Sequence, residues 1–150
     1  MSAPLLDFLA LGPLVQAKLR ETLPPQVFVL DSKDLASITE QQQPAPAVHV
    51  LFGGFMPRAG NAAWEELEQR WITVIVVRNV ASLPGAASSE LDAGPLMMAT
   101  INALRPWAVP LDGFGTLHLD TPMKPAFKAG FGYYPIAWKV THRVPVRPKR

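Results

Sequence analysis

An α+β fold with a mostly antiparallel sheet and two main helices packed on it is predicted by three observations. Apolar residues make up 49% of the 150 residues and charged residues 17%, a composition typical of a chain with one folded core. The 16 prolines divide the chain into short elements. The expected elements come in the order helix, strand, strand, strand, helix, strand, strand, without the regular alternation of a parallel sheet. We therefore expect one domain over residues 1–150.

The first expected elements are a helix and a short strand. Pro13 suits the first turn of the helix, which has an apolar side and is ended by Pro24-Pro25. Residues 26–30 are predicted to form a strand, and residues 33–38 a helical turn.

The next two strands are separated by a glycine pair, Gly53-Gly54. Alternating residues over 47–52 predict a strand that runs into this pair. Residues 68–79 give the strongest strand pattern, because residues 71–77 are nearly all β-branched or aromatic. Both faces of this strand are apolar, so we expect it to lie centrally in the sheet, covered on each side.

A loop and a second helix follow. Residues 82–89 are small and include glycine and proline, which is typical of a loop. The helix is expected to begin near Asp92, with Pro95 in its first turn, and to end before Pro106.

Two further strands complete the expected sheet. Residues 116–120 alternate between apolar and polar side chains. The last strand, residues 133–144, has the clearest two-sided pattern. Its apolar face contains Tyr134, Ile136, Trp138, Val140 and Val144, and its polar face contains Lys139, Thr141 and Arg143.

Several kinds of chemistry are excluded by the residues present. The chain has no cysteine, which excludes disulfides, cysteine zinc sites, iron–sulfur clusters and thiol nucleophiles. No serine lies in a Gly-x-Ser-x-Gly motif. Glu66 and Glu68 share a strand face that Glu65 does not, and we interpret them as a solvated start of a strand. We expect no enzyme activity and no cofactor. No apolar run reaches the roughly eighteen residues of a membrane-spanning helix.

Histidines and glycines offer two weaker motifs. His49, His118 and His142 with Asp120 lack the spacing of a known metal motif, so we interpret them as polar strand positions and expect no metal site. The repeats Gly113-Phe114-Gly115 and Gly130-Phe131-Gly132 lack the context of a phosphate-binding loop, and their glycines are expected to permit tight turns or bulges.

Hydropathy and charge point to partners. The mean hydropathy of +0.14 is high for a small domain, which indicates apolar surface that meets another subunit or partner. Residues 121–150 contain seven basic residues and no acidic one, whereas Glu65, Glu66 and Glu68 form a compact acidic group. Head-to-tail contacts between identical subunits are therefore possible on charge grounds.

Binding of single-stranded nucleic acid is the alternative from another functional class. Aromatic and basic residues interleave in the basic C-terminal segment: Lys128, Phe131, Tyr133, Tyr134, Trp138, Lys139 and Arg143. Tyr134 and Trp138 fall on the apolar face, opposite Lys139 and Arg143, so the aromatic side chains are interpreted as core and the basic ones as rim.

Four segments match a known protein family in their size and order. They are Ala17-Lys18-Leu19-Arg20-Glu21-Thr22-Leu23-Pro24, Glu68-Gln69-Arg70-Trp71-Ile72-Thr73-Val74-Ile75-Val76-Val77-Arg78, Gly94-Pro95-Leu96 through Leu104-Arg105-Pro106-Trp107, and residues 134–144. With these elements the chain resembles the tail terminator (tail completion) proteins of long-tailed bacteriophages, of the type found in Mu-like genomes. Another phage head–tail joining protein, such as a head-completion protein, is the alternative within this group.

The resemblance implies a non-enzymatic virion protein that forms a homo-oligomeric ring, typically a hexamer. Such a ring caps the tail tube protein, stops tube polymerisation and presents a face to the head–tail connector protein. It implies that genomic DNA passes through the lumen without sequence-specific binding, and that no cofactor and no membrane is involved. The expected location is the head-proximal end of the virion tail, after assembly in the cytoplasm of the bacterial host.

Six residues are candidates for the assembly interface. Phe55 and Met56, with Arg58, lie in residues 53–58, which are expected to be a flexible loop after a strand. We expect this loop to contact a neighbouring ring or subunit, the alternative being ordinary packing within one domain. Arg78 and Arg143 are expected to form interface salt links, and Lys139 lies on the polar face of the last strand.

Overall fold

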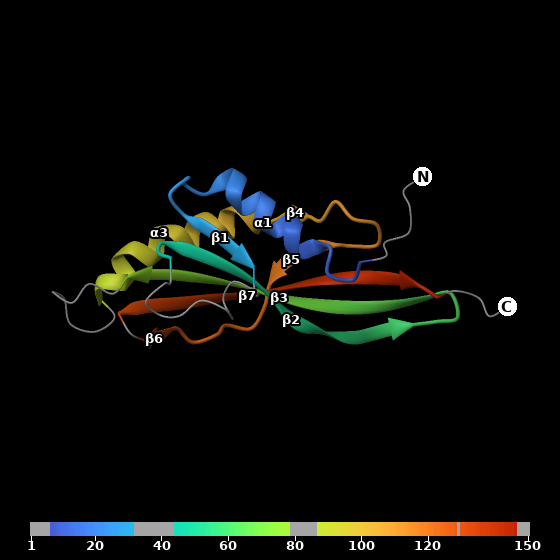
Figure 1. The fold of residues 1–150 in the computed structure, drawn as a ribbon. Coiled ribbons are helices and arrows are strands. Elements are labelled where there is room, and N and C mark those ends of the chain that lie inside the picture. The colour runs from blue at the N-terminus through green and yellow to red at the C-terminus, as the bar shows by residue number, and fades with distance from the viewer. Residues whose placement is uncertain (1–6, 32–43, 79–86, 129, 147–150) are drawn as a thin grey trace.

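A seven-stranded sheet with two helices forms the described part of the protein. The computed structural model describes residues 7–31, 44–78, 87–128 and 130–146. In chain order the elements are α1 (Leu11–Thr22), β1 (Phe28–Asp31), β2 (Ala47–Gly60), β3 (Trp64–Arg78), α3 (Ala87–Leu104), β4 (Trp107–Ala108), β5 (Thr116–Leu119), β6 (Ala126–Lys128) and β7 (Phe131–Pro145). Figure 1 shows α1 and α3 on the same face of the sheet. The predicted α+β class is confirmed.

The sheet is built around three long antiparallel strands. Its order is β1-β2-β3-β7-β5-β4, and β6 also pairs with β7. The β3 and β7 strands pair along their whole length, from Trp64 opposite Pro145 to Arg78 opposite Phe131. Among the strands that the structure describes, only β1 and β2 pair in parallel. The β3 strand thus lies centrally between β2 and β7, as its apolar sequence predicts.

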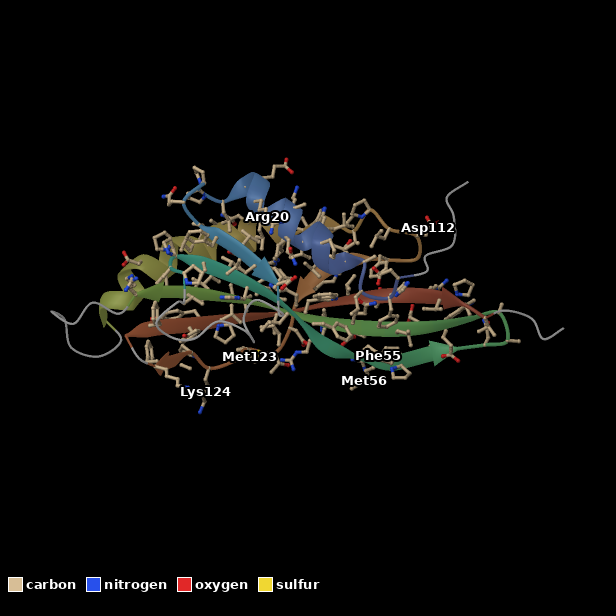
Figure 2. All side chains as sticks on the ribbon, viewed as in Figure 1. Arg20, Phe55, Met56, Asp112, Met123 and Lys124 are labelled. Carbon is tan, nitrogen blue, oxygen red and sulfur yellow. The ribbon has the colours of Figure 1, made fainter. Side chains whose placement is uncertain are left out.

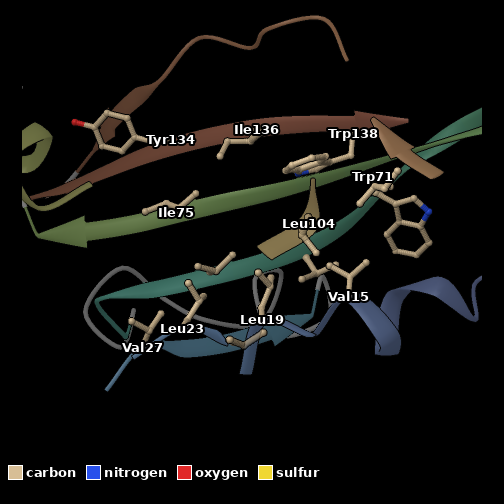
Figure 3. Close-up of a cluster of buried hydrophobic side chains, with 14 of the residues drawn as sticks. Val15, Leu19, Leu23, Val27, Trp71, Ile75, Leu104, Tyr134, Ile136 and Trp138 are labelled. Atoms are coloured by element: carbon tan, nitrogen blue, oxygen red, sulfur yellow. The ribbon is translucent and has the colours of Figure 1, made fainter. Parts of the chain in front are cut away.

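The main core lies between this sheet and the helices. Trp71, Ile75 and Trp138 come from β3 and β7, and they pack with Leu19 of α1 and Leu104 of α3 (Figure 3). Trp138 is fully buried, and its indole Nε1 donates a hydrogen bond to the Thr73 hydroxyl at 3.0 Å. Because a tryptophan buries a large apolar area, this residue is a major source of core stability.

A smaller apolar cluster occupies the opposite face of the sheet. Val74 and Val76 of β3 pack there with Ala47 and Phe131. Residues 71–77 are therefore apolar on both faces because each face contributes to a core. Along β7 the two faces also separate as predicted, with Tyr134, Ile136, Trp138 and Val140 buried in the main core.

Two predicted boundaries are wrong. Residues 53–58 form part of β2 and not a loop. The glycine pair, with Gly54 at φ +95°, allows a bulge after which β2 resumes its pairing with β3. The second helix begins at Ala87 and continues through Pro95, and it therefore includes residues 87–89 of the predicted loop. A proline inside a helix removes one backbone hydrogen bond, and packing of the helix on the core compensates for that loss.

Two short strands were not predicted, and two predictions fall on residues outside the described ranges. The short strands β4 and β6 were not predicted, because two or three residues show no periodicity. The helical turn expected over residues 33–38 and the loop expected over 82–86 lie outside the described residues. Neither helix of the described part is long and apolar enough to cross a membrane.

Candidate assembly surface

Among the described residues, the end of the sheet farthest from α3 is formed mainly by the three long strands. We call this part the β-extension: residues 53–60 of β2, 64–70 of β3 and 139–145 of β7. Figure 1 shows it on the right, opposite α3. Its register aligns Met56 with Glu68 and Thr141, and Glu66 with Arg143. Residues aligned in this way share a face of the sheet, which fixes the face on which each predicted interface residue lies.

One edge of the β-extension is open. The β1 strand pairs with β2 only over Ala47–Val50, and within the described residues no strand pairs with the outer edge of β2 from Leu51 onward. The register of β2 shifts between Phe52 and Phe55 and again between Pro57 and Ala59. A free strand edge is a surface on which another chain can dock.

Phe55 and Met56 are both more than half exposed on this edge, at 55% each. They face opposite sides of the sheet, because Phe55 is aligned with Gln69 and Met56 with Glu68. The Phe55 ring contacts the Phe8 ring edge-on, with centroids 5.1 Å apart. Met56 lies on the face away from the helices (Figure 2). The segment is thus a paired strand that presents one large apolar side chain on each face.

The face that carries Met56 is rich in ion pairs. Arg58 donates two hydrogen bonds to Glu68, from Nε to Oε2 at 3.1 Å and from Nη2 to Oε1 at 2.9 Å. These bonds raise the pKa of the Arg58 guanidinium. Arg70 Nε lies 3.3 Å from Asp120 Oδ2. A pocket of about 460 Å³ is lined by Met56 and by these four charged side chains, among others.

Arg143 lies farther along the same face. Its Nε is 3.6 Å from Glu66 Oε1, and its guanidinium lies 4.2 Å from the centre of the Trp64 ring. Exposed ion pairs contribute only about 0–1 kcal/mol each to stability. They therefore add little to the stability of the fold, and the charged groups stay accessible at the surface. Glu66 and Glu68 share this face, as the sequence predicts.

The structure brings four of the six candidate residues together. Met56, Arg58, Lys139 and Arg143 share the face away from the helices. Lys139 is half-buried and aligned with Arg70 and with His118. Phe55 is close in sequence but faces the helix side. Arg78 lies at the opposite end of β3, with its guanidinium 5.5 Å from the centre of the Phe131 ring.

Of the aromatic residues of β7, only Tyr133 is partly exposed, and it packs against the smaller apolar cluster. Tyr134 and Trp138 are buried in the main core, as expected, and Phe131 is buried on the other face. Binding of single strands requires exposed aromatic faces on which bases can stack. Arg143, one of the basic residues in the alternative interpretation, is paired with Glu66.

The histidines lie apart from one another. His49 and His142 are buried on different faces of the sheet, aligned with Val74 and Leu67 respectively, while His118 is exposed. No group of three or more potential metal ligands occurs among the residues that the structure describes.

His142 belongs to a buried polar network that the sequence did not reveal. The Gln69 amide Nε2 is 3.2 Å from His142 Nδ1 and donates a hydrogen bond to the backbone oxygen of Phe8 at 3.0 Å. Trp71 Nε1 donates to Gln69 Oε1 at 2.9 Å. The His142 ring stacks on Phe114 at 3.9 Å, and burial lowers the pKa of its imidazole. A glutamine in a strand pattern gives no signal of such a network.

The fold and this surface define an α+β protein whose distinctive exposed features are a strand edge and a group of ion pairs, a class suited to contacts with other proteins. The comparisons with known proteins identify the family. The family described as phage tail terminator protein matches residues 1–148, and the chain belongs to this family of bacteriophage tail structural proteins. The comparison with curated proteins found no match.

Proposed function

We propose that the protein forms a ring, typically a hexamer, that caps the tail tube at its head-proximal end. In this role it stops polymerisation of the tube protein and presents a docking face to the head–tail connector, while genomic DNA passes through the lumen without sequence-specific binding. Subunits fold in the cytoplasm of the bacterial host and act in the virion tail without performing a reaction. Family membership supports the tail role.

The observation that carries the proposal is the open edge of β2 with Phe55 and Met56 exposed beside it. A monomer that remained alone would leave these large apolar side chains in water. Burying them against another protein removes this unfavourable exposure at about 25 cal/mol per Å² of apolar surface. In a ring with closed symmetry each subunit would make this contact with its neighbour, and the modest contacts together would stabilise the ring.

A double substitution tests this use of the β2 edge. Phe55→Ser with Met56→Ser should leave the subunit folded, because both side chains lie outside the buried core. The protein concentration needed for assembly should rise at least tenfold. The mass of the purified protein gives the oligomeric state, and electron microscopy of tails gives their length and the fraction joined to heads. Met98→Ser, at an exposed methionine of α3, is the matched control.

Three results would count against the proposal. The double variant could assemble and terminate tails normally, or the unaltered protein could remain monomeric even with tail tubes. Imaging that placed the protein on the head portal and not on the tube end would favour a head-completion role. Binding of single-stranded DNA that falls steeply with salt concentration would instead support the nucleic-acid alternative.

A further inference from the structure

A turn of the chain just before α1 lies against the helix side of the β-extension. We call residues 7–10 the N-terminal turn. The backbone N–H groups of Leu9 and Ala10 donate hydrogen bonds to Asp7, at 2.9 Å to the side chain and 3.2 Å to the backbone oxygen. Phe8 is half-buried and contacts the β-extension, whereas Leu9 is 44% exposed. The turn therefore packs one of its sides on the sheet.

A row of aromatic rings connects the N-terminal turn with the core and with the open edge of β2. The Phe52 ring lies 5.2 Å from the Trp71 ring and 6.2 Å from the Phe8 ring, measured between ring centres. The Phe8 ring in turn lies 5.1 Å from Phe55. All three contacts are edge-on, an arrangement that aromatic pairs favour. Because Trp71 is buried in the main core, the row runs from the core to the exposed ring of Phe55.

Gln69 makes a second connection between the core and the N-terminal turn. Its fully buried side chain accepts a hydrogen bond from Trp71 Nε1 and donates one to the backbone oxygen of Phe8. An indole N–H can only donate, so the amide turns its oxygen toward Trp71 and its nitrogen toward Phe8. Gly12 adds a third contact, because a Cβ atom built there would lie 3.1 Å from the Trp71 ring. The turn is thus held at both of its ends.

Phe55 lies where a strand by itself gives a side chain little support. It follows the Gly53-Gly54 bulge, and within the described residues β2 is paired here with β3 alone. Gln69 is aligned with Phe55 on β3, and Phe8 contacts the Phe55 ring from the N-terminal turn. An exposed side chain loses rotamer freedom when a partner buries it, which weakens binding. A ring that is already held loses less freedom and binds more strongly.

We propose that Gln69 and Phe8 act as a brace that holds the Phe55 ring in the orientation in which it meets a neighbouring subunit. This inference rests on the proposed assembly through the β2 edge and adds the residues that prepare that edge. Gln69 is a positioning residue. Because its side chain is fully buried, it has no surface for a partner, and its effect on assembly passes through Phe8 and Phe55.

Amide hydrogen exchange in the free subunit tests the brace itself. Gln69→Glu keeps an oxygen for the indole but removes the amide N–H groups, and Phe8→Ala removes the ring. Each change should speed exchange at the amides of Ala10 and Gly12, which close the turn, by about tenfold. Phe28→Ala, at an exposed phenylalanine of β1, is the matched control and should leave these rates unchanged. Unchanged exchange in both brace variants would overturn the proposal.

Assembly of the same variants tests whether the brace serves the contact. Phe8→Ala should raise the protein concentration needed for assembly about three- to tenfold, the cost of immobilising one more side chain, and Gln69→Glu should act in the same direction. Adding Phe8→Ala to Phe55→Ala should cause no further loss, since a brace has no effect without the ring that it holds. Equal losses from Phe8→Ala with and without Phe55 would overturn the proposal.

The two measurements separate failure of this inference from failure of the proposed function. A ring that forms equally well with Phe8→Ala overturns the brace alone. An unaltered protein that stays monomeric, both free and with tail tubes, overturns the ring, and this inference falls with it. If Gln69→Glu lost the cooperative unfolding transition, Phe8→Ala would decide alone, because Phe8 lies outside both buried apolar clusters.

Discussion

At the scale of single residues, His142 shows how the sheet holds a polar group inside its core. The imidazole is stacked on Phe114, and its Nδ1 faces the amide of Gln69. The amide is a donor there, so the neutral ring accepts through Nδ1 and a protonated ring would place donor against donor. Burial lowers the pKa of His142 below its usual value near 6.5.

This arrangement predicts a pH dependence of stability. The unfolded state binds a proton at this imidazole more readily than the folded state does. The contribution of neutral His142 to the free energy of unfolding is therefore complete above about pH 6.5 and declines as the pH falls below that value. The difference in unfolding free energy between the protein and His142→Gln should therefore shrink from pH 7.5 to pH 5.5. Urea unfolding at several pH values measures it, with His118→Gln as the control for loss of an imidazole elsewhere. A difference that stays constant with pH would contradict the prediction.

Gly113 provides a second residue-scale case. It has φ +81°, and a Cβ atom built there would lie 2.5 Å from the backbone oxygen of Arg143. Gly130 has φ +83° with no atom within 4 Å of such a Cβ. The glycines of both Gly-Phe-Gly repeats thus permit special backbone conformations, as the sequence predicts.

The two glycines separate steric overlap from backbone strain. Gly130→Ala should lower stability by roughly 1 kcal/mol, the cost of a left-handed conformation for an L-residue. Gly113→Ala should lower it by about 2 kcal/mol or more, since the overlap adds to the strain. Thermal and urea unfolding of both variants measure the difference, and equal losses would show that the backbone near Gly113 shifts freely.

At the scale of elements, β2 combines pairing with interruption. Its bulge, Pro57 and Arg58 are three devices that discourage indiscriminate pairing of an exposed strand. They occur within six residues that also expose Phe55 and Met56. The element is therefore suited to a defined partner and protected against open-ended association.

Restoring a backbone donor at this edge should promote aggregation. Pro57→Thr supplies the missing N–H and a residue that favours strands, so we expect faster light-scattering growth on mild heating with little change in the unfolding transition. Pro110→Thr, at an exposed position outside the strands, should behave like the unaltered protein. Equal aggregation of all three proteins would show that Pro57 does not protect the edge.

Elements with strong periodicity were predictable and the interruptions were not. The alternation of β7 and the β-branched run of β3 depend on burial, which residue type reports directly. Gly53-Gly54 and Pro95 were misread, because each marks a turn or a helix start unless tertiary contacts continue the element past it. The sequence predicted that Phe55 and Met56 are available for contact with a partner. Their positions on opposite faces of a paired strand could be known only from the register with β3.

At the scale of the whole molecule, the β-extension combines charges of both signs. On its face away from the helices Arg58 pairs with Glu68 and Arg143 with Glu66, and Arg70 pairs with Asp120 beyond β5. The candidate interface could be predicted only in part from sequence. Residue types indicated Arg58, Lys139 and Arg143, but their grouping with Met56 depends on which strands are neighbours.

The placement of α1 and α3 on one face gives the subunit an inside and an outside before any partner arrives (Figure 1). Copies joined side by side in one orientation must all turn their helices the same way. The circumference available to bulky helices is larger on the convex wall of a cylinder than on its concave wall. A single layer of helices on one face would therefore make each subunit wider on that side and favour a curved assembly.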